Sequence, residues 1–254
     1  MPSNLLWSPN NGDTHLTKFI NINKSKVKNE NYESIHNWSI NNKEEFWSSI
    51  WDYTEIIGEK KRPIIENEKD FFNSKFFKNC KLNFTENILQ KNNDEDAIVF
   101  YSEKKITRSV SWKKLKADVN KISNFFKQKG IKKGDRIAGI LPNFPETVIS
   151  FLATAKIGAV WSSCSSDFGP NAIIDRFQQI NPKILIITDF YFYNNKKIDT
   201  LVNIESILEG IPSVEEVIII PYDLKQRDYN INFYYNKWDD ILKKNEELID
   251  FEKF

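Results

Sequence analysis

The segment from Gly158 to Lys183 holds the densest group of side chains that could take part in chemistry. It contains a Ser-Ser-Cys-Ser-Ser run centred on Cys164, an Asp-Phe-Gly-Pro turn that begins at Asp167, and the neighbours Asp175 and Arg176. A cysteine is a nucleophile only as the thiolate, which requires a base, a cation or a helix N-terminus beside it. The chain has only two histidines, both far from this segment in sequence. The pattern favours Cys164 as a small buried residue over a reactive thiol.

No complete phosphate-binding motif accompanies this segment. A phosphate loop needs clustered glycines, so that several backbone N–H groups can approach one anion. The 8 glycines are spread along the chain, and no two are closer than four residues apart. The run GIKKGDRIAG at 130–139 is better explained by a helix end and a turn into a strand. We therefore expect no ATP phosphate site in this chain.

The sequence also lacks the residues that hydrolytic or metal-dependent catalysis requires. There is no GxSxG elbow, and two histidines with two separated cysteines do not give the usual spacing of a zinc site. Adjacent carboxylates point in different directions on a helix, so we expect the acidic pairs to be solvated. These pairs are Glu44/Glu45, Asp239/Asp240 and Glu246/Glu247. We predict no catalytic residue and no metal ligand.

Composition excludes several classes of partner. The 36 basic and 35 acidic residues leave a net charge of +1, which gives no field to attract nucleic acid or an anionic membrane. Cys80 and Cys164 lack CxxC spacing, which favours a reducing compartment over a disulfide scaffold. The N-terminus lacks a basic segment followed by ~7–15 apolar residues, and no apolar span of ~18 residues occurs. These features predict a cytoplasmic protein.

From residue 96 onward, strand-like and helix-like runs alternate. The strand-like runs fall at 97–101, 106–110, 136–141, 159–162, 184–188 and 216–220. The helix-like runs fall at 112–126, 145–156, 170–180 and 201–208. The first two strands flank SEKK as a hairpin, and the rest predict βαβ units. We expect an α/β fold with three layers, in which helices cover both faces of a largely parallel sheet.

The loop at 162–169 is expected at the ligand-binding edge of that sheet. It leaves a strand and enters a helix, and ligands of parallel sheets bind outside the carboxyl ends of the strands. Gly169 is expected to permit the turn, and Pro170 to begin the helix. We expect Asp175 and Arg176 to form a structural pair rather than to contact a ligand.

Residues 1–95 do not show the alternation of strand-like and helix-like runs found after residue 96. Their pattern predicts a mostly helical, aromatic-rich extension. Phe46, Ile50 and Trp51 recur at helical intervals after the start signal at Asn41 and Asn42. Tryptophans at helical spacing usually pack, so packing is favoured over a ligand-stacking surface for Trp38, Trp47 and Trp51. We predict two domains, with bounds at 1–95 and 96–254.

Two adjoining segments resemble a known family. GIKKGDRIAGILPNFPETVISFLATAKIGAV at 130–160 resembles the N-terminal domain of the AMP-forming acyl-CoA synthetases, which belong to the adenylate-forming superfamily. WSSCSSDFGPNAIIDRFQQINPKILI, which follows, is similar to the acetoacetyl-CoA synthetases rather than to the acetyl branch, which has a His-Ser start and a Gly-Gly-Phe-Ser turn. Further similar segments are NLLWSPN, HLTKFI, YESIHNWSINNKEEFW, KLNFTENIL, YNNKK and IESILEGIPSVEEVIIIPY. The resemblance therefore covers nearly the whole chain.

The resemblance implies a ligase that joins acetoacetate to CoA through an acyl-adenylate, using ATP and Mg²⁺ and releasing pyrophosphate and AMP. The family's Ser-Gly-Thr-Thr-Gly loop, nucleotide site and acyl pocket do not occur in this sequence. It therefore implies an N-terminal portion that lacks the ATP and Mg²⁺ sites and is inactive alone. Three alternatives remain open: half of a split enzyme whose second chain supplies the rest, a non-catalytic remnant or interaction module, and a ligase for acetate, propionate or another short acid.

The resemblance also carries over one site, in the vicinity of CoA. In the acetyl branch, arginines meet the 3′-phosphate of CoA at the place where this chain has Tyr193 and Lys196, with Lys197 beside them. Asp167 is expected to border the CoA entrance, because its loop should lie beside this segment. An exposed ion pair contributes only about 0–1 kcal/mol, so Lys196 can tune CoA affinity but cannot hold CoA alone. A solvated lysine without a ligand is the alternative for Lys196.

Overall fold

The computed structural model describes residues 14–103, 106–244 and 248–254. Their contacts divide the chain into unit 1, Met1–Lys81, and unit 2, Leu82–Phe254. The expectations for NLLWSPN, for the centre of the SEKK turn and for Glu246/Glu247 fall outside the described residues. Within those ranges, no helix is both long and apolar enough to cross a membrane.

Unit 1 is built from short helices and very short strands. Its elements are α1 (His15–Ile22), a 3₁₀ turn (Lys24–Lys26), α2 (Tyr32–Asn41), α3 (Lys43–Tyr53), β1 (Gly58–Glu59), β2 (Ile65–Glu66) and β3 (Lys75–Phe76). The side chains of Thr14 and Asn31 cap α1 and α2. Phe19, Ile35 and Trp38 form the centre of a small core. The predicted helical character of this region is confirmed.

The tryptophans of unit 1 mostly pack, as predicted. Trp38 and Trp51 are buried, whereas Trp47 is partly exposed and its ring meets the ring of Phe76 edge-on at 5.5 Å. Glu45 is exposed, as predicted, and its carboxylate also accepts a hydrogen bond from Trp38 Nε1 at 3.2 Å. That hydrogen bond, aided by Lys26, lowers the pKa of Glu45.

Unit 2 contains a five-stranded parallel sheet. Its strands are β7 (Arg136–Ile140), β8 (Val160–Cys164), β9 (Ile184–Thr188), β12 (Glu216–Ile220) and β13 (Asn236–Lys237). They lie in the order β13-β12-β9-β7-β8, and every neighbouring pair is parallel. β9 is buried along its whole length, which explains its continuous apolar sequence. The predicted largely parallel sheet is confirmed.

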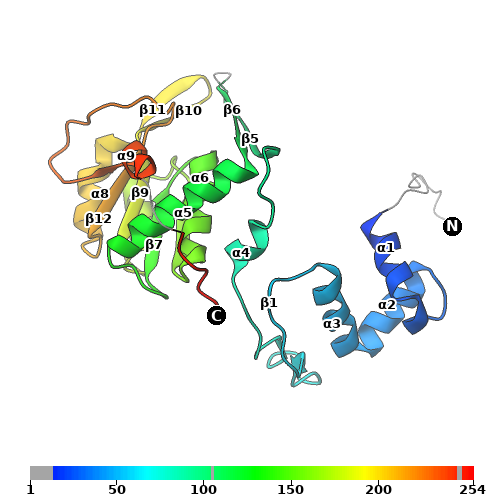
Figure 1. Cartoon of the computed structure of the whole chain (residues 1–254). Coiled ribbons are helices and arrows are strands. Elements are labelled where there is room, and N and C mark those ends of the chain that lie inside the picture. Colours follow the sequence, from blue (N-terminus) through cyan, green and yellow to red (C-terminus); the bar gives the residue numbers. More distant parts are fainter. Residues whose placement is uncertain (1–13, 104–105, 245–247) are drawn as a thin grey trace, which may run out of the picture. The chain divides into compact units, whose positions relative to one another are not determined.

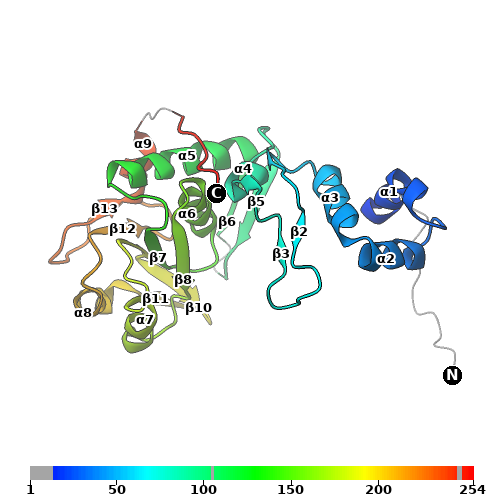
Figure 2. The same cartoon turned by 90° about the horizontal axis from the view of Figure 1, so that it is seen from below.

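Helices cover both faces of this sheet (Figures 1 and 2). They are α5 (Trp112–Gln128), α6 (Pro145–Lys156), α7 (Pro170–Phe177), α8 (Ile204–Gly210) and α9 (Trp238–Lys243). A short helix, α4 (Phe84–Ile88), contacts α6. The core on one face includes side chains from α5, α6 and α9, and the core on the other includes side chains from α7 and α8. The predicted three-layer α/β architecture is confirmed.

Two antiparallel hairpins and one short strand complete unit 2. The first hairpin pairs β5 (Asp96–Tyr101) with β6 (Thr107–Ser111), as predicted. The second pairs β10 (Phe190–Tyr193) with β11 (Lys196–Asp199). β4 (Lys81–Leu82) stands at the sequence boundary of the two units.

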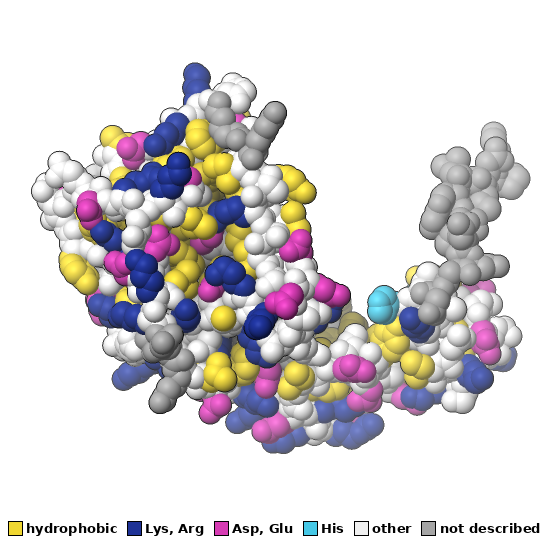
Figure 3. All heavy atoms as spheres, turned by 45° about the horizontal axis from the view of Figure 1, so that its top comes forward, with side chains coloured by type: hydrophobic (Ala, Val, Ile, Leu, Met, Phe, Trp, Pro, Cys, Tyr) yellow, Lys and Arg dark blue, Asp and Glu magenta, His cyan; other side chains and the backbone are white. Residues whose placement is uncertain are grey.

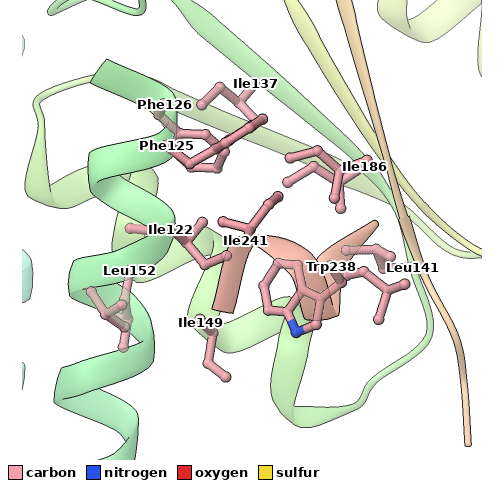
Figure 4. Packing of buried hydrophobic residues seen from close by; sticks show 14 of the residues in the cluster. Ile122, Phe125, Phe126, Ile137, Leu141, Ile149, Leu152, Ile186, Trp238 and Ile241 are labelled. Atoms are coloured by element: carbon pink, nitrogen blue, oxygen red, sulfur yellow. The ribbon is translucent and has the colours of Figure 1, made fainter. Parts of the chain in front are cut away.

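The larger core of unit 2 is built from large aliphatic and aromatic side chains (Figure 4). Ile122 and Phe126 of α5 point toward the sheet, and neither is exposed to solvent. Trp238, from α9, is 1% exposed and closes the same core from another side. Burial of one such side chain stabilises the fold by about 1.5–3 kcal/mol, so this cluster is the main source of stability.

Helix boundaries follow the predicted signals where those signals are local. The hydroxyl of Ser111 accepts a hydrogen bond from the Lys114 N–H and caps α5. Gly130 follows the end of α5 with a left-handed φ of 76°, which glycine adopts without strain. Pro145 and Pro170 are the first residues of α6 and α7.

Some boundaries differ from the prediction. α7 ends at Phe177 rather than at residue 180, because the chain then turns through Asn181, with φ at 48°, into Pro182. The stretch 201–208 is a 3₁₀ turn (Leu201–Asn203) followed by α8. The β10–β11 hairpin was not predicted, since its aromatic and basic residues lack the alternation of a half-buried strand.

The last described segment, 248–254, is fastened to the helical layer of unit 2. The Asn83 side-chain amide donates to the backbone carbonyls of Ala155, Lys156 and Glu252. Lys156 is 4% exposed; its Nζ donates to Asn120 Oδ1 at 2.7 Å and lies 4.8 Å from the ring centre of Phe251. Burial lowers the pKa of Lys156 to about 8.

Candidate functional site

The carboxyl edge of the sheet brings two loops together. β8 ends at Cys164 and leads through a short loop into α7, while β9 ends at Thr188 and leads through Asp189 into β10. Because β8, β7 and β9 are parallel, both loops leave the sheet at the same edge. The expected position of the loop at 162–169 is confirmed.

A hollow of about 160 Å³ lies between these loops. Its polar lining includes Ser166 and Asp167 from the first loop, and Tyr191, Asp199, Thr200 and Asn203 from the second segment. Its apolar lining is Ile140, Phe168, Gly169, Pro170, Ile173, Ile187, Ile198 and Ile207. No lysine or arginine lines it, so the hollow suits hydrogen-bond donors of a neutral group better than a phosphate.

The two faces of the β10–β11 hairpin have different surroundings. Tyr191 pairs with Ile198, and Tyr193 pairs with Lys196, so these side chains share one face of the hairpin. Tyr191 and Ile198 line the hollow together with Asp167. Tyr193 and Lys196 therefore extend the face that borders the hollow. On the forward face of unit 2 in Figure 3, basic and hydrophobic side chains are interspersed.

Lys197 lies on the opposite face of the hairpin. It pairs with Phe192, and its ammonium is 3.9 Å from the ring centre of Phe190. The rings of Phe190 and Phe192 both meet Tyr222, so this face packs onto an aromatic cluster. Of the four residues predicted near CoA, Asp167, Tyr193 and Lys196 therefore lie on the side of the hollow. Lys197 lies on the other face of the hairpin.

Asp189 anchors the start of the hairpin, and the sequence reasoning missed it. Its Oδ1 accepts the N–H groups of Phe190 at 2.9 Å and Tyr222 at 2.8 Å. Its Oδ2 accepts Arg227 at 2.9 Å and the Tyr229 hydroxyl at 3.1 Å. Burial raises the pKa of Asp189 despite these donors. An acidic residue directly after a fully buried strand was the available sequence signal.

The turn of the hairpin is fixed at two points. Asn194 and Asn195 have φ values of 49° and 61°, which asparagine tolerates and which a two-residue hairpin turn requires. The Asn195 N–H donates to the carboxylate of Glu103 at 2.9 Å, so the β5–β6 hairpin supports the β10–β11 turn. Lys196 is thereby presented from an ordered turn rather than from a free loop.

The titratable groups around the hollow give no reactive nucleophile. Cys164 is 6% exposed, and burial raises its pKa to about 11, so the thiol stays protonated at neutral pH. The prediction of a buried Cys164 is confirmed. Burial, with smaller contributions from Asp167 and Tyr193, also raises the pKa of Tyr191. Tyr191 is therefore a hydrogen-bonding group here and not a base.

Two local expectations for α7 are wrong. Asp175 and Arg176 are both exposed, and the guanidinium of Arg176 lies 4.9 Å from the ring centre of Phe168 instead of pairing with its neighbour. Adjacent helical side chains diverge, which explains the missing pair. Gly169 has an ordinary extended backbone, and a Cβ added there would meet no atom within 4 Å. The turn therefore does not require glycine.

The described residues do not fit the phosphates of ATP or a bound metal ion. The glycines with left-handed φ are Gly130, Gly134 and Gly158, and they serve separate turns rather than one cradle. In the part of the chain that the structure describes, no three His, Cys, Asp or Glu side chains are grouped so that they could hold a metal. Cys80 and Cys164 are both free thiols.

A parallel sheet with covering helices and a hollow at its carboxyl edge agrees with the comparison to protein families. The profile described as "AMP-binding enzyme" matches residues 84–247, which is more than half of the chain. The chain therefore belongs to the AMP-binding enzyme family.

Within that family, the chain is similar to acetoacetyl-CoA synthetases. It is 37% identical over 191 residues to the acetoacetyl-coenzyme A synthetase of Rhizobium meliloti (strain 1021), covering 75% of this chain and 29% of the relative. It is 34% identical over 240 residues to the acetoacetyl-CoA synthetase of Xenopus tropicalis, covering 91% of this chain and 36% of the relative. The predicted resemblance is confirmed.

A solved structure gives the same result. The acetoacetyl-CoA synthetase from Streptomyces lividans matches with a TM-score of 0.88 and 26% identity, covering 98% of this chain and 39% of that chain. The present chain thus spans about a third of the length of the relatives it matches. It corresponds to their N-terminal portion.

Proposed function

We propose that this chain is the N-terminal part of an acetoacetate–CoA ligase, which forms acetoacetyl-CoA from acetoacetate, CoA and ATP with release of AMP and pyrophosphate. The names of the similar relatives support the reaction. The observation that carries the role of this chain is the hollow between the Asp167 loop and the β10–β11 hairpin.

In this proposal CoA makes two kinds of contact, one in the hollow and one on the neighbouring face of the β10–β11 hairpin. CoA carries neutral amide, hydroxyl and amino donors as well as a 3′-phosphate. The carboxylate of Asp167 suits the donors, whereas the ammonium of Lys196, beside Tyr193 on the same hairpin face, suits the phosphate. Lys197 was also predicted near CoA. In this proposal it does not contact CoA but stabilises the hairpin, because its ammonium covers the ring of Phe190.

The proposal assigns adenylation to the part of the ligase outside this chain. ATP phosphates in such reactions are held by backbone N–H groups and by Mg²⁺, which neutralises their charge. This assignment is supported by the described glycines of left-handed φ, which serve separate turns, and by the lack of a metal-type cluster of His, Cys, Asp or Glu among the described residues. The rest of the ligase is supplied by a continuation of this polypeptide or by a second one.

Two further assignments belong to the same proposal. Residues 1–95 are assigned to an N-terminal extension and residues 96–254 to the first part of the AMP-binding domain, and the change from short helices to a parallel sheet supports two parts. The contacts divide the chain earlier, after Lys81, and the family match begins at residue 84. A cytoplasmic location is supported by two thiols that remain unpaired, as in a reducing compartment.

Substitutions on the two sides of the hollow are expected to affect CoA binding differently. In a joined polypeptide, with this chain followed by the downstream part of the Rhizobium meliloti synthetase, Lys196→Ala should raise KM for CoA by up to about fivefold. KM for 3′-dephospho-CoA should not change, because Lys196 is assigned to the 3′-phosphate. Asp167→Ala should raise KM for both compounds, since both carry the same neutral donors.

Initial rates of thioester formation at varied CoA and 3′-dephospho-CoA give these values. Lys197→Ala is the comparison variant, because its side chain lies on the other face of the hairpin. Equal KM values for CoA in the unmodified, Lys196→Ala and Asp167→Ala polypeptides would contradict the assignment of CoA to this hollow.

A further inference from the structure

One edge of the parallel sheet in unit 2 is unpaired. β8 is the last strand in the order β13-β12-β9-β7-β8 and pairs only with β7 (Figure 2). The Val160 N–H donates to the Asp135 carbonyl, and the Cys164 carbonyl accepts from the Leu141 N–H, so these groups point toward β7. Because successive peptide groups alternate along a strand, the N–H and C=O groups of Trp161 and Ser163 point outward.

The outward groups of β8 have no backbone partner among the described residues. Natural proteins protect free edges with charged residues, proline or very short strands, because an open edge is a template for another strand. The opposite edge follows this rule: β13 has two residues, one of which is Lys237. β8, with the sequence VWSSC over five residues, carries none of these protections.

Apolar surface is exposed on β8 and on a helix that shares its neighbour α6. Val160 is 49% exposed, although it belongs to the sheet. α6 contacts both β8 and α4, and on α4 the side chains of Phe84 and Ile88 are 46% and 40% exposed. The ring of Phe84 lies 5.6 Å from that of Phe151 on α6. A partner that pairs with β8 would therefore also find apolar side chains to cover.

We propose that an extended strand from the downstream part of the ligase adds to the sheet along β8, hydrogen-bonding to Trp161 and Ser163. Main-chain pairing of this kind supplies affinity, and the neighbouring apolar side chains supply specificity. This inference rests on the proposed function. A strand from the downstream part is favoured over a second copy because this chain matches only 39% of the Streptomyces lividans chain. The remaining part of such a ligase is joined to this fold, and a joined segment reaches the edge at a higher effective concentration than a separate copy does.

Amide hydrogen exchange measures the pairing directly. The exchange rates of Trp161 and Ser163 should be at least tenfold slower in the joined polypeptide than in the chain alone. The amides of Val160 and Ser162, which point toward β7, serve as internal controls and should be protected in both. Unchanged exchange at Trp161 and Ser163 would overturn the inference.

A proline at Ser163 supplies a second, independent test. Ser163→Pro removes an outward N–H without removing a bond to β7, and proline is accepted on an edge strand with that orientation. It should leave the melting temperature of the chain nearly unchanged and weaken binding of a separately produced downstream part at least tenfold. Ser162→Pro, which removes an inward N–H, should instead destabilise the chain itself. Equal binding by the Ser163→Pro chain would contradict strand addition.

Other results have distinct meanings. A concentration-dependent dimer of the chain alone, with slowed exchange at Trp161 and Ser163, would replace the proposed occupant by a second copy and so overturn the proposal. Slowed exchange in a joined polypeptide that forms no acetoacetyl-CoA would support strand addition while contradicting the proposed function. If the separate downstream part does not fold, the exchange comparison in the joined polypeptide still decides the question.

Discussion

Replacement of Glu146 by alanine is expected to lower the free energy of unfolding by about 3–5 kcal/mol. The carboxylate lies at the start of α6 and accepts both terminal nitrogens of Arg108 on β6, at 2.7 and 3.0 Å. The side chains are 6% and 16% exposed, and Arg108 also lies over the ring of Phe100. Without Glu146, the guanidinium would be left buried and unpaired, which costs more than the loss of the ion pair itself.

Equilibrium unfolding in urea, followed by circular dichroism, measures this effect. Lys243→Ala is the matched control, because it removes an ion pair whose two side chains are 63% and 56% exposed. That substitution should change the free energy of unfolding by no more than about 0.5 kcal/mol. A loss below about 1 kcal/mol for Glu146→Ala would mean that water or another group compensates Arg108.

The stability of the chain is expected to rise by about 3 kcal/mol between about pH 8 and pH 10.5, through Lys156. Burial lowers the pKa of this ammonium from its usual 10.5 to about 8, with Lys127 and Lys116 adding to the shift and Asp250 opposing it. Within this window the unfolded chain binds more protons than the folded one. The destabilisation by the buried ammonium is therefore absent above pH 10.5, and it grows as the pH falls toward 8.

The contribution of Lys156 is isolated by comparison with Lys156→Met. Methionine retains apolar length beside Phe251 but has no proton to release. Other groups titrate over the same pH range, but they do so in both proteins and cancel in the difference. The measurement is the difference in urea unfolding free energy at pH 7.5 and at pH 10. A difference that does not change between these pH values would show that Lys156 keeps its ordinary pKa.

Local signals in the sequence were sufficient for the elements that carry the parallel sheet. Ser111 and Gly130 bracket α5, and both act through contacts within a few residues of the helix ends. β9 was recognisable because a strand buried on both faces is apolar at every position. The alternation of such elements was sufficient for the three-layer architecture.

The sheet edge that carries the candidate site could be predicted, whereas the arrangement of its residues could not. The edge at which the Asp167 loop emerges follows from strand direction alone. Which face of the hairpin carries Lys196 and which carries Lys197 depends on the pairing of β10 with β11, which the sequence pattern did not reveal. Asp189 gains its importance from Tyr222 and Arg227, which lie more than thirty residues away in sequence.

Long-range polar contacts were the least predictable part of the molecule. Asn83 reads as an ordinary helix cap, and it does cap α4. Its side-chain amide also donates to the carbonyl of Glu252, at a sequence separation of 169 residues. Such contacts form only after the whole unit has folded, so no local pattern specifies them.

Acetoacetate-dependent exchange of labelled pyrophosphate into ATP tests the central claim most directly. The claim is that this chain supplies a CoA-facing surface and part of the AMP-binding fold, while its described residues supply no place for the phosphates of ATP. We expect no exchange by the 254-residue chain alone and clear exchange once the downstream part of the Rhizobium meliloti synthetase is joined to it. Exchange by the chain alone, or none from a folded joined polypeptide, would contradict the account.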